Sequence, residues 1–175
     1  NAVVAVSPIN TVCQGFVMER GIAVAPGSTW SFHGEEVPYT GFGLEKFPLG
    51  HVLRKSIMAR EVTMYDLYLP LVKSPDPAAA IRAEEITGPL LLISSRMDTM
   101  WPSTEAAERI MARLREKRFS HACEHLCYDH GCHLFVPMEL RLAKFFKGDR
   151  GKNRGLGRRA RMDSLIKTLE FVSQW

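Results

Sequence analysis

The sequence predicts an α/β fold with a short parallel sheet, and three observations support this. Two short runs, Val3-Val4-Ala5-Val6 and Leu90-Leu91-Leu92-Ile93, are entirely apolar, which is typical of strands buried on both faces of a sheet. A helical pattern follows the second run, and a less apolar strand candidate from His121 to Tyr128 comes next. Strand, helix and strand in this order indicate parallel strands joined by right-handed crossovers.

Each element has its own signal. We expect the first two runs to be buried strands, the second starting after Gly88-Pro89, and the third to lie nearer an edge. The clearest helix is predicted over residues 103–117, with Pro102 in its first turn and an apolar face of Ala107, Ile110, Met111 and Leu114. A last helix is predicted over residues 162–173, burying Leu165, Ile166, Leu169 and Val172.

A long segment, residues 8–87, separates the first two strands and is predicted to be an insertion. It is rich in Gly, Pro and aromatic residues up to about Gly50 and becomes more helical over residues 52–71. Asp76-Pro77 resembles an N-cap and first helical residue for a short turn through Ile81. Insertions of this size are usually functional, so we expect a lid or the wall of a pocket.

Length and composition indicate one globular domain. The chain has 175 residues, of which 46% are hydrophobic and 24% charged, so neither a disordered chain nor a membrane span is expected. Four cysteines are too few for a disulfide scaffold, and we expect a reducing, cytoplasmic location. Because the chain begins within a strand-like run, we expect it to be the later part of a longer protein.

The positive charge is concentrated in residues 141–161. This basic segment has nine Lys and Arg residues and one acid, whereas the rest of the chain has 14 basic and 18 acidic residues. Binding of nucleic acid or of the phosphates of coenzyme A is one interpretation. The interleaved glycines favour a solvated loop before the last helix instead, and we expect no nucleic-acid partner. Phe145 and Phe146 are expected to anchor this segment in the core.

Two residues have the order of a catalytic acid and base. Asp98 follows the strand that begins at Leu90, and His133 follows the strand that ends near Tyr128. Catalytic groups of doubly wound sheets lie just beyond the carboxyl ends of the strands. An acid after one strand and a histidine after the next is the Asp-then-His half of an α/β-hydrolase triad. The alternatives are a loop carboxylate that caps the following helix and a structural histidine.

The stretch HACEHLCYDHGCH, residues 121–133, also resembles a zinc site. Alternate residues of a strand share a face but lie about 6.6 Å apart, so four such ligands cannot converge on one ion. We therefore expect buried thiols and no metal site.

The chain also resembles a known family. The stretches GPLLLISSRMDTMWPSTEAAERIMARL, CYDHGCHLF and IKTLEFV resemble the C-terminal part of the acyl-CoA thioesterase and bile acid-CoA:amino acid N-acyltransferase family, and VVAVSP resembles the strand after its nucleophile. The resemblance implies the C-terminal portion of an α/β-hydrolase fold, with Asp98 as triad acid and His133 as triad base.

The sequence departs from this family in two ways. Cys132 stands where the family usually has Gly before the histidine, and the chain contains no G-x-S-x-G or G-x-C-x-G elbow. Ser7, Cys13 and Ser28 do not follow a strand-turn-helix pattern, so we expect no nucleophile in this chain.

The resemblance implies thioester hydrolysis of an acyl-CoA or transfer of its acyl group to an amino acid, without a cofactor. Another α/β-hydrolase, such as a carboxylesterase or peptidase, would share both residues, and a non-catalytic or metal-binding module is the alternative from another class. Because residues 3–6 would form an unblunted sheet edge, we also expect a homodimer through that edge.

Overall fold

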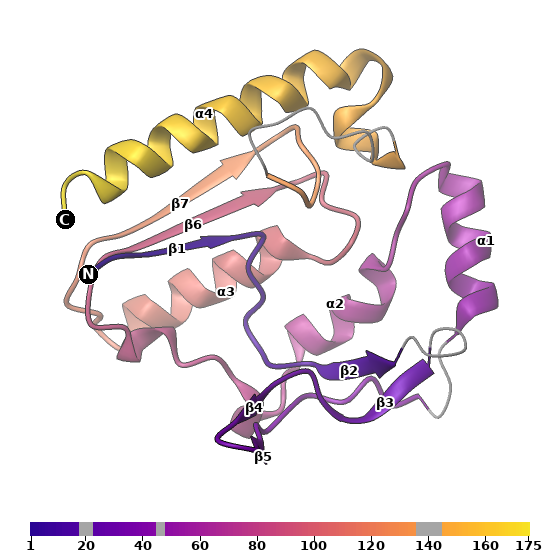
Figure 1. Ribbon diagram of the computed structural model, residues 1–175, viewed down its shortest axis with the longest axis horizontal. Helices are drawn as coiled ribbons and strands as arrows, with labels where there is room; N and C mark the ends of the chain where they lie inside the picture. The colour runs from indigo at the N-terminus through magenta and orange to yellow at the C-terminus, as the bar shows by residue number, and fades with distance from the viewer. Residues whose placement is uncertain (18–22, 45–47, 136–144) are drawn as a thin grey trace.

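A three-stranded parallel sheet forms the centre of the molecule (Figure 1). The computed structural model describes residues 1–17, 23–44, 48–135 and 145–175. The strands are β1 (Val3–Val6), β6 (Leu90–Ser95) and β7 (Cys123–Tyr128), in the order β1-β6-β7. Val3 pairs with Leu90, and Leu90 pairs with Cys123, so the carboxyl ends of the three strands lie side by side. The sheet is the one that the sequence predicts.

Helices cover both faces of this sheet, with α3 (Ser103–Glu116) on one face and α4 (Arg154–Val172) on the other (Figure 1). Strand β6 is buried along its whole length because it lies in the middle. Its alternate residues serve two cores: Leu90 and Leu92 pack against α3, whereas Leu91 and Ile93 pack with residues of α4. A continuous apolar run therefore becomes the shared centre of three layers.

Strand β1 is less buried than the sequence predicts. Val3 is 39% exposed and Val6 is 46% exposed. The prediction of a buried strand is wrong for these two residues, whereas Ala5 packs against the α3 core and Val4 against the α4 core. As the sequence also predicts, β1 is an edge strand in the described sheet, with β6 as its one neighbour. The prediction that the third strand lies at an edge is confirmed for β7.

Helix α3 agrees closely with its prediction. Ala107, Ile110 and Leu114 are buried, and Met111 packs beside them. Pro102 is the N-cap rather than a residue of the first turn, and Lys117 is the C-cap. The apolar spacing in the sequence therefore identifies the inward face of this helix correctly.

Helix α4 differs from its prediction in length and in orientation. It begins at Arg154, and the 3-10 turns η4 (Lys147–Asp149) and η5 (Gly151–Asn153) precede it, so the predicted solvated loop is wrong over residues 147–161. Its buried residues are Gly157, Ala160, Arg161, Ser164 and Phe171, whereas the predicted Ile166, Leu169 and Val172 are exposed and Leu165 is half-buried. Small residues face inward because they let the helix approach the rest of the fold closely.

Of the two aromatic residues predicted to anchor the basic segment, Phe146 is buried and Phe145 is exposed. The part of that segment at residues 141–144 lies outside the described residues.

The segment between β1 and β6 folds into two small hairpins and two helices. The hairpins are β2 (Gln14–Val17) with β3 (Ala23–Ser28), and β4 (Ser31–Phe32) with β5 (Glu35–Glu36). Helices α1 (Leu49–Ala59) and α2 (Tyr65–Lys73) follow, and then the turns η1 (Pro77–Ala79) and η2 (Ala83–Glu85). Asp76 caps η1 as predicted, accepting a hydrogen bond of 2.8 Å from the Ala78 amide. No helix in the described ranges is long and apolar enough to cross a membrane.

Candidate active site

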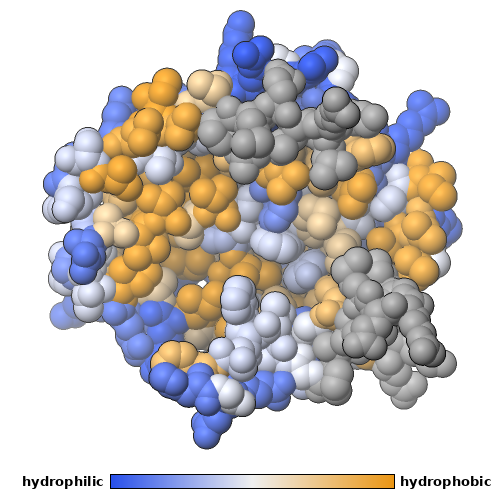
Figure 2. Space-filling view, viewed as in Figure 1, coloured by the Kyte–Doolittle hydropathy of each residue, from blue (hydrophilic) through white to orange (hydrophobic). Residues whose placement is uncertain are grey.

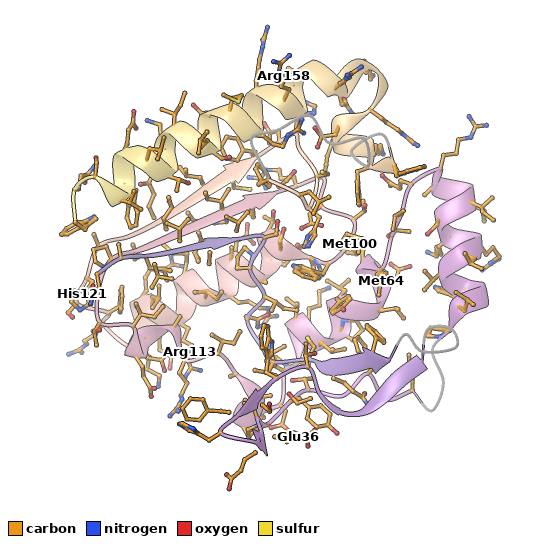
Figure 3. All side chains as sticks on the ribbon, viewed as in Figure 1. Glu36, Met64, Met100, Arg113, His121 and Arg158 are labelled. Carbon is orange, nitrogen blue, oxygen red and sulfur yellow. The ribbon has the colours of Figure 1, made fainter. Side chains whose placement is uncertain are left out.

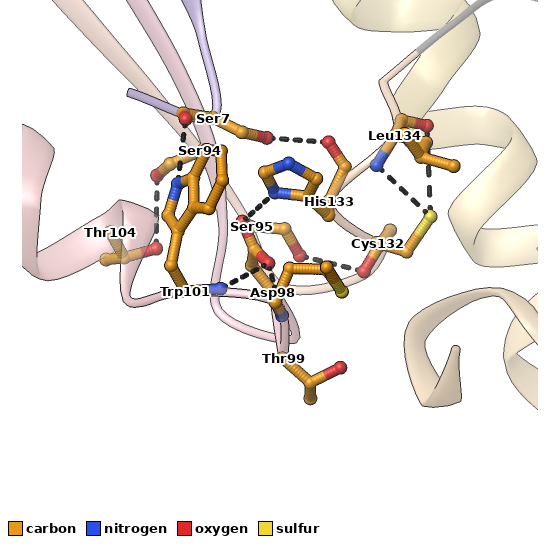
Figure 4. A network of polar contacts seen from close by, with 12 residues as sticks. Ser7, Ser94, Ser95, Asp98, Thr99, Trp101, Thr104, Cys132, His133 and Leu134 are labelled. Atoms are coloured by element: carbon orange, nitrogen blue, oxygen red, sulfur yellow. Dashed lines mark hydrogen bonds and ion pairs between the residues drawn. The ribbon is translucent and has the colours of Figure 1, made fainter. Parts of the chain in front are cut away.

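The loop after β6 holds a buried carboxylate in one orientation (Figure 4). Asp98 is 4% exposed, and its Oδ1 accepts hydrogen bonds from the amides of Met100 at 3.0 Å and Trp101 at 3.5 Å. These contacts engage one carboxylate oxygen and leave Oδ2 for a partner outside the loop. Both amides belong to the loop, and α3 begins at Ser103 with Pro102 as its N-cap and without a side-chain cap hydrogen bond, so the alternative of a carboxylate that caps this helix is wrong.

His133, in the loop after β7, is that partner. Its Nδ1 lies 3.0 Å from Asp98 Oδ2, and the imidazole is partly buried. An ionised carboxylate only accepts hydrogen bonds, so Nδ1 is assigned as the donor and Nε2 keeps its lone pair. This is the orientation in which a carboxylate prepares a histidine to accept a proton at Nε2. The structure thus brings together the two residues that the sequence predicts as acid and base.

Ser95, the last residue of β6, connects the two loops. Its Oγ donates a hydrogen bond of 3.0 Å to the carbonyl oxygen of Gly131 and accepts one of 3.1 Å from the Met97 amide. Gly131 has φ +116°, a backbone conformation that side chains rarely adopt. The histidine loop is therefore bound directly to the strand that carries the Asp98 loop.

Two further residues, Ser7 and Trp101, complete the surroundings of His133. Ser7 Oγ donates a hydrogen bond of 2.8 Å to the His133 carbonyl oxygen, and Trp101 Nε1 donates one of 3.0 Å to the Ser7 carbonyl oxygen. The Trp101 indole lies edge-on to the imidazole, with ring centroids 4.1 Å apart. Sequence reasoning missed both contacts. The available signals were the position of Ser7 at a strand end and the place of Trp101 three residues after Asp98.

None of the three side chains considered as nucleophiles has the context of a nucleophile elbow. Ser7 has φ 47°, but Pro8 follows it and has no N–H to stabilise an oxyanion. Burial raises the pKa of the Cys13 thiol to about 12, so it is not a ready thiolate. Ser28 ends the hairpin strand β3, and its Oγ accepts from the Trp30 amide.

Cys132, which precedes His133, is buried as well. Burial raises the pKa of its thiol, although the positive charge of Arg161 acts in the opposite direction. Its sulfur contacts the backbone of Leu134, with the Leu134 amide 3.4 Å away. The residue that departs from the family pattern is therefore a packed thiol rather than an activated one.

The insertion approaches this site through a row of aromatic rings. Tyr68 of α2 lies 5.5 Å from Trp101 between ring centroids, and Phe42 lies 5.3 Å from Tyr68. The backbone also joins the two parts, because the Met64 amide donates to the Thr99 carbonyl oxygen at 2.9 Å. Figure 3 labels Met64 and Met100 on the two segments that meet there. The aromatic insertion thus lies directly beside the Asp98 loop.

The cysteine- and histidine-rich strand β7 uses its polar groups within the core. His125 Nε2 lies 2.8 Å from Ser94 Oγ, and Cys127 Sγ lies 3.8 Å from Thr104 Oγ1. Burial lowers the pKa of His125. Over the described ranges, no three His, Cys, Asp or Glu side chains are grouped as metal ligands.

Comparison with known proteins identifies the family. The protein-family model for the C-terminal part of BAAT and acyl-CoA thioester hydrolases matches residues 9–139, about three quarters of the chain. No curated protein matches the sequence. The matched range contains Asp98 and His133, and the parallel sheet flanked by helices is that of the α/β-hydrolase-like part of these proteins. The chain therefore belongs to the BAAT/acyl-CoA thioester hydrolase C-terminal family.

Proposed function

We propose that the chain supplies the acid and base of an acyl-CoA thioesterase or an acyl-CoA:amino acid N-acyltransferase. The observation that supports this most directly is the hydrogen bond between Asp98 Oδ2 and His133 Nδ1 at the carboxyl ends of two parallel strands. The nucleophile is proposed to lie outside this chain, because neither Ser7, Cys13 nor Cys132 has the required surroundings.

In the proposed mechanism, His133 Nε2 takes the proton of a serine or cysteine nucleophile as it attacks the acyl thioester. Asp98 holds the imidazole in the required tautomer and stabilises the imidazolium that forms. The imidazolium then returns the proton to the thiolate of coenzyme A as it leaves. In the second half, His133 deprotonates water or an amino acid, which attacks the acyl-enzyme and releases the product.

The aromatic insertion supports an acyl substrate. Trp101 lies against the imidazole, and the rings of Tyr68 and Phe42 extend this wall away from it. We propose that this row of rings contacts the acyl chain. An acyl-CoA is the substrate that the family match favours over the ester or peptide of another α/β-hydrolase.

All four cysteines are free, which supports a reducing compartment, and we propose the cytoplasm.

The test is to express this chain together with the coding sequence that precedes it in its gene, as one protein. We expect turnover of palmitoyl-CoA or choloyl-CoA, and Asp98→Asn should lower kcat by about 10⁴-fold because it gives the wrong histidine tautomer. His133→Ala should have an effect of similar size, whereas His121→Ala, at an exposed position before β7, should have none.

Analysis of the reaction products distinguishes a thioesterase, an N-acyltransferase and the alternative of an esterase or peptidase. Adding glycine or taurine distinguishes N-acyl transfer from hydrolysis, and a panel of p-nitrophenyl esters and peptides tests for an esterase or peptidase. The chain alone should not hydrolyse acyl-CoA. Turnover that survives His133→Ala in the longer protein would contradict the proposed roles.

We also propose that, in the chain by itself, the open edge of β1 pairs with a second copy. The Val3 amide donates to the carbonyl oxygen of Pro89, just before β6, and the Ser7 amide donates to that of Ile93 in β6. The alternate residues Val4 and Val6 therefore direct their N–H and C=O groups to the open side. An antiparallel pair of β1 strands would match Val4 with Val6 of the second copy around a two-fold axis at Ala5. Figure 2 shows apolar side chains at the surface over the region of β1 and α4. Among the residues of these elements, Val6, Ile166 and Leu169 are exposed.

A further inference from the structure

A buried ion pair between Asp149 and Arg161 lies beside the histidine loop. Asp149, at the end of η4, is 2% exposed, and Arg161, on the inward face of α4, is 4% exposed. The guanidinium of Arg161 contacts the Asp149 carboxylate at its Oδ1. Both residues lie beyond residue 139, where the family match ends.

The backbone next to this ion pair supports the histidine loop. The Gly131 amide donates a hydrogen bond of 3.3 Å to the Gly148 carbonyl oxygen. A side chain at Gly148 has no space, because a Cβ there would lie 1.9 Å from the Gly131 carbonyl oxygen. Residue 148 is therefore in direct backbone contact with a residue two positions before His133.

The ion pair adjoins Gly148 and packs against α4. Asp149 is packed against Gly157 of α4, where a Cβ would come within 2.4 Å of Asp149 Oδ1 and 2.6 Å of the Gly148 carbonyl oxygen. Arg161, one helical turn further, holds the carboxylate in that place. The positive charge of Arg161 also affects Cys132, which adjoins His133. Helix α4 is thus connected to the histidine loop through Arg161, Asp149 and Gly148.

We infer that Asp149 and Arg161 are positioning residues for His133. The inference rests on the proposed function of His133 as the base. The ion pair fixes η4 against α4. Through the hydrogen bond between Gly148 and Gly131, η4 then fixes the loop that directs the imidazole of His133 toward Asp98. Removing one partner leaves an unpaired buried charge, which displaces η4 and loosens the loop.

The test measures the histidine and its loop by NMR on this chain. In Asp149→Asn, we expect the ring signals of His133 to shift or broaden and amide exchange at Gly131 to accelerate roughly tenfold or more. The Ala106 amide of α3 is the internal reference, because it should exchange as in the wild type. Arg161→Lys keeps the charge and should retain most of the protection at Gly131.

Two further variants complete the design. If Asp149→Asn does not fold, Asp149→Leu combined with Arg161→Met removes both charges, leaves neither unpaired, and should still loosen Gly131. Glu84→Gln breaks the Arg113–Glu84 ion pair on the α3 side and should leave His133 unchanged.

Wild-type ring signals and wild-type Gly131 exchange in a folded Asp149 variant would overturn the inference. Asp98→Asn tests the proposed function separately, because it alters the hydrogen bond to His133 directly. If Asp98→Asn leaves the ring signals unchanged, the proposed acid–base pair is wrong. If Asp98→Asn shifts the ring signals of His133 but the Asp149 variants leave them unchanged, only the positioning role is wrong.

Discussion

Ser7 and His133 are joined by a hydrogen bond of 2.8 Å from the Ser7 hydroxyl to the His133 carbonyl oxygen, although 126 positions separate them in the chain. Ser7 adopts the left-handed conformation with φ 47° at the end of β1. A serine there costs about 1–2 kcal/mol relative to the usual backbone regions. The bond, together with that from Trp101 to the Ser7 carbonyl oxygen, holds this strained turn beside the imidazole.

Replacing Ser7 separates the hydrogen bond from the backbone strain. Ser7→Ala should lower the free energy of unfolding by about 1 kcal/mol, because it removes the bond and keeps the strained conformation. Ser7→Gly removes the bond and relieves the strain, so it should be less destabilising than Ser7→Ala. Urea unfolding followed by circular dichroism measures both. If the alanine variant is as stable as the wild type, the bond makes no net contribution.

The stability of the fold should depend on the protonation of His125. Burial lowers the pKa of this histidine below its ordinary value of 6.5. In the window between the folded-state pKa and 6.5, the unfolded chain therefore binds the proton more readily than the folded chain. The contribution of His125 to stability should be complete above pH 6.5 and should decrease as the pH falls through that window.

The measurement compares the pH dependence of thermal unfolding in two variants. His125→Gln should show a smaller loss of stability below pH 6.5 than the wild type, because the titrating group is gone. His121→Gln, at an exposed position near the same strand, should retain the wild-type dependence. Identical pH profiles for His125→Gln and the wild type would show that His125 does not cause the dependence.

Two glycines of the C-terminal region should respond oppositely to alanine. Gly148→Ala should destabilise the protein by about 1–3 kcal/mol, because the new Cβ would overlap the Gly131 carbonyl oxygen. Gly155→Ala, in the first turns of α4, meets open space and should stabilise by about 0.5–1 kcal/mol through helix propensity. Denaturant unfolding of both variants tests this, and a neutral Gly148→Ala would mean that the contact can relax.

The open edge of β1 should make the chain associate with itself. Analytical ultracentrifugation on the order of tens of micromolar should detect a dimer of the wild type. Val6→Lys should shift it to the monomer, since a lysine at a strand edge opposes pairing with another chain. Lys167→Ala, at an exposed position of α4, changes the net charge by one unit in the opposite direction and should leave the dimer intact. A wild type that is strictly monomeric would contradict the proposed pairing.

Local patterns in the sequence determined most of the sheet, helix α3 and the two predicted site residues. The run from Leu90 is apolar at every position because β6 is buried on both faces, and the spacing of Ala107, Ile110 and Leu114 identifies the inward face of α3. Asp98 and His133 could be selected because each follows a strand, and parallel strands end at one edge. Apolar runs, helical spacing and the position of a residue after a strand depend only on residues that are close in the sequence, so one sequence is enough to detect them.

Tertiary structure alone decided the contacts around those residues. Helix α4 buries Gly157, Ala160 and Arg161 and exposes larger apolar side chains, because close approach to η4 and the buried Asp149 determines its orientation rather than apolar spacing. The hydrogen bond from Ser7 to His133 likewise depends on β1 and the histidine loop meeting in space. Contacts between distant segments follow from how whole elements pack, and no local pattern in the sequence records that packing.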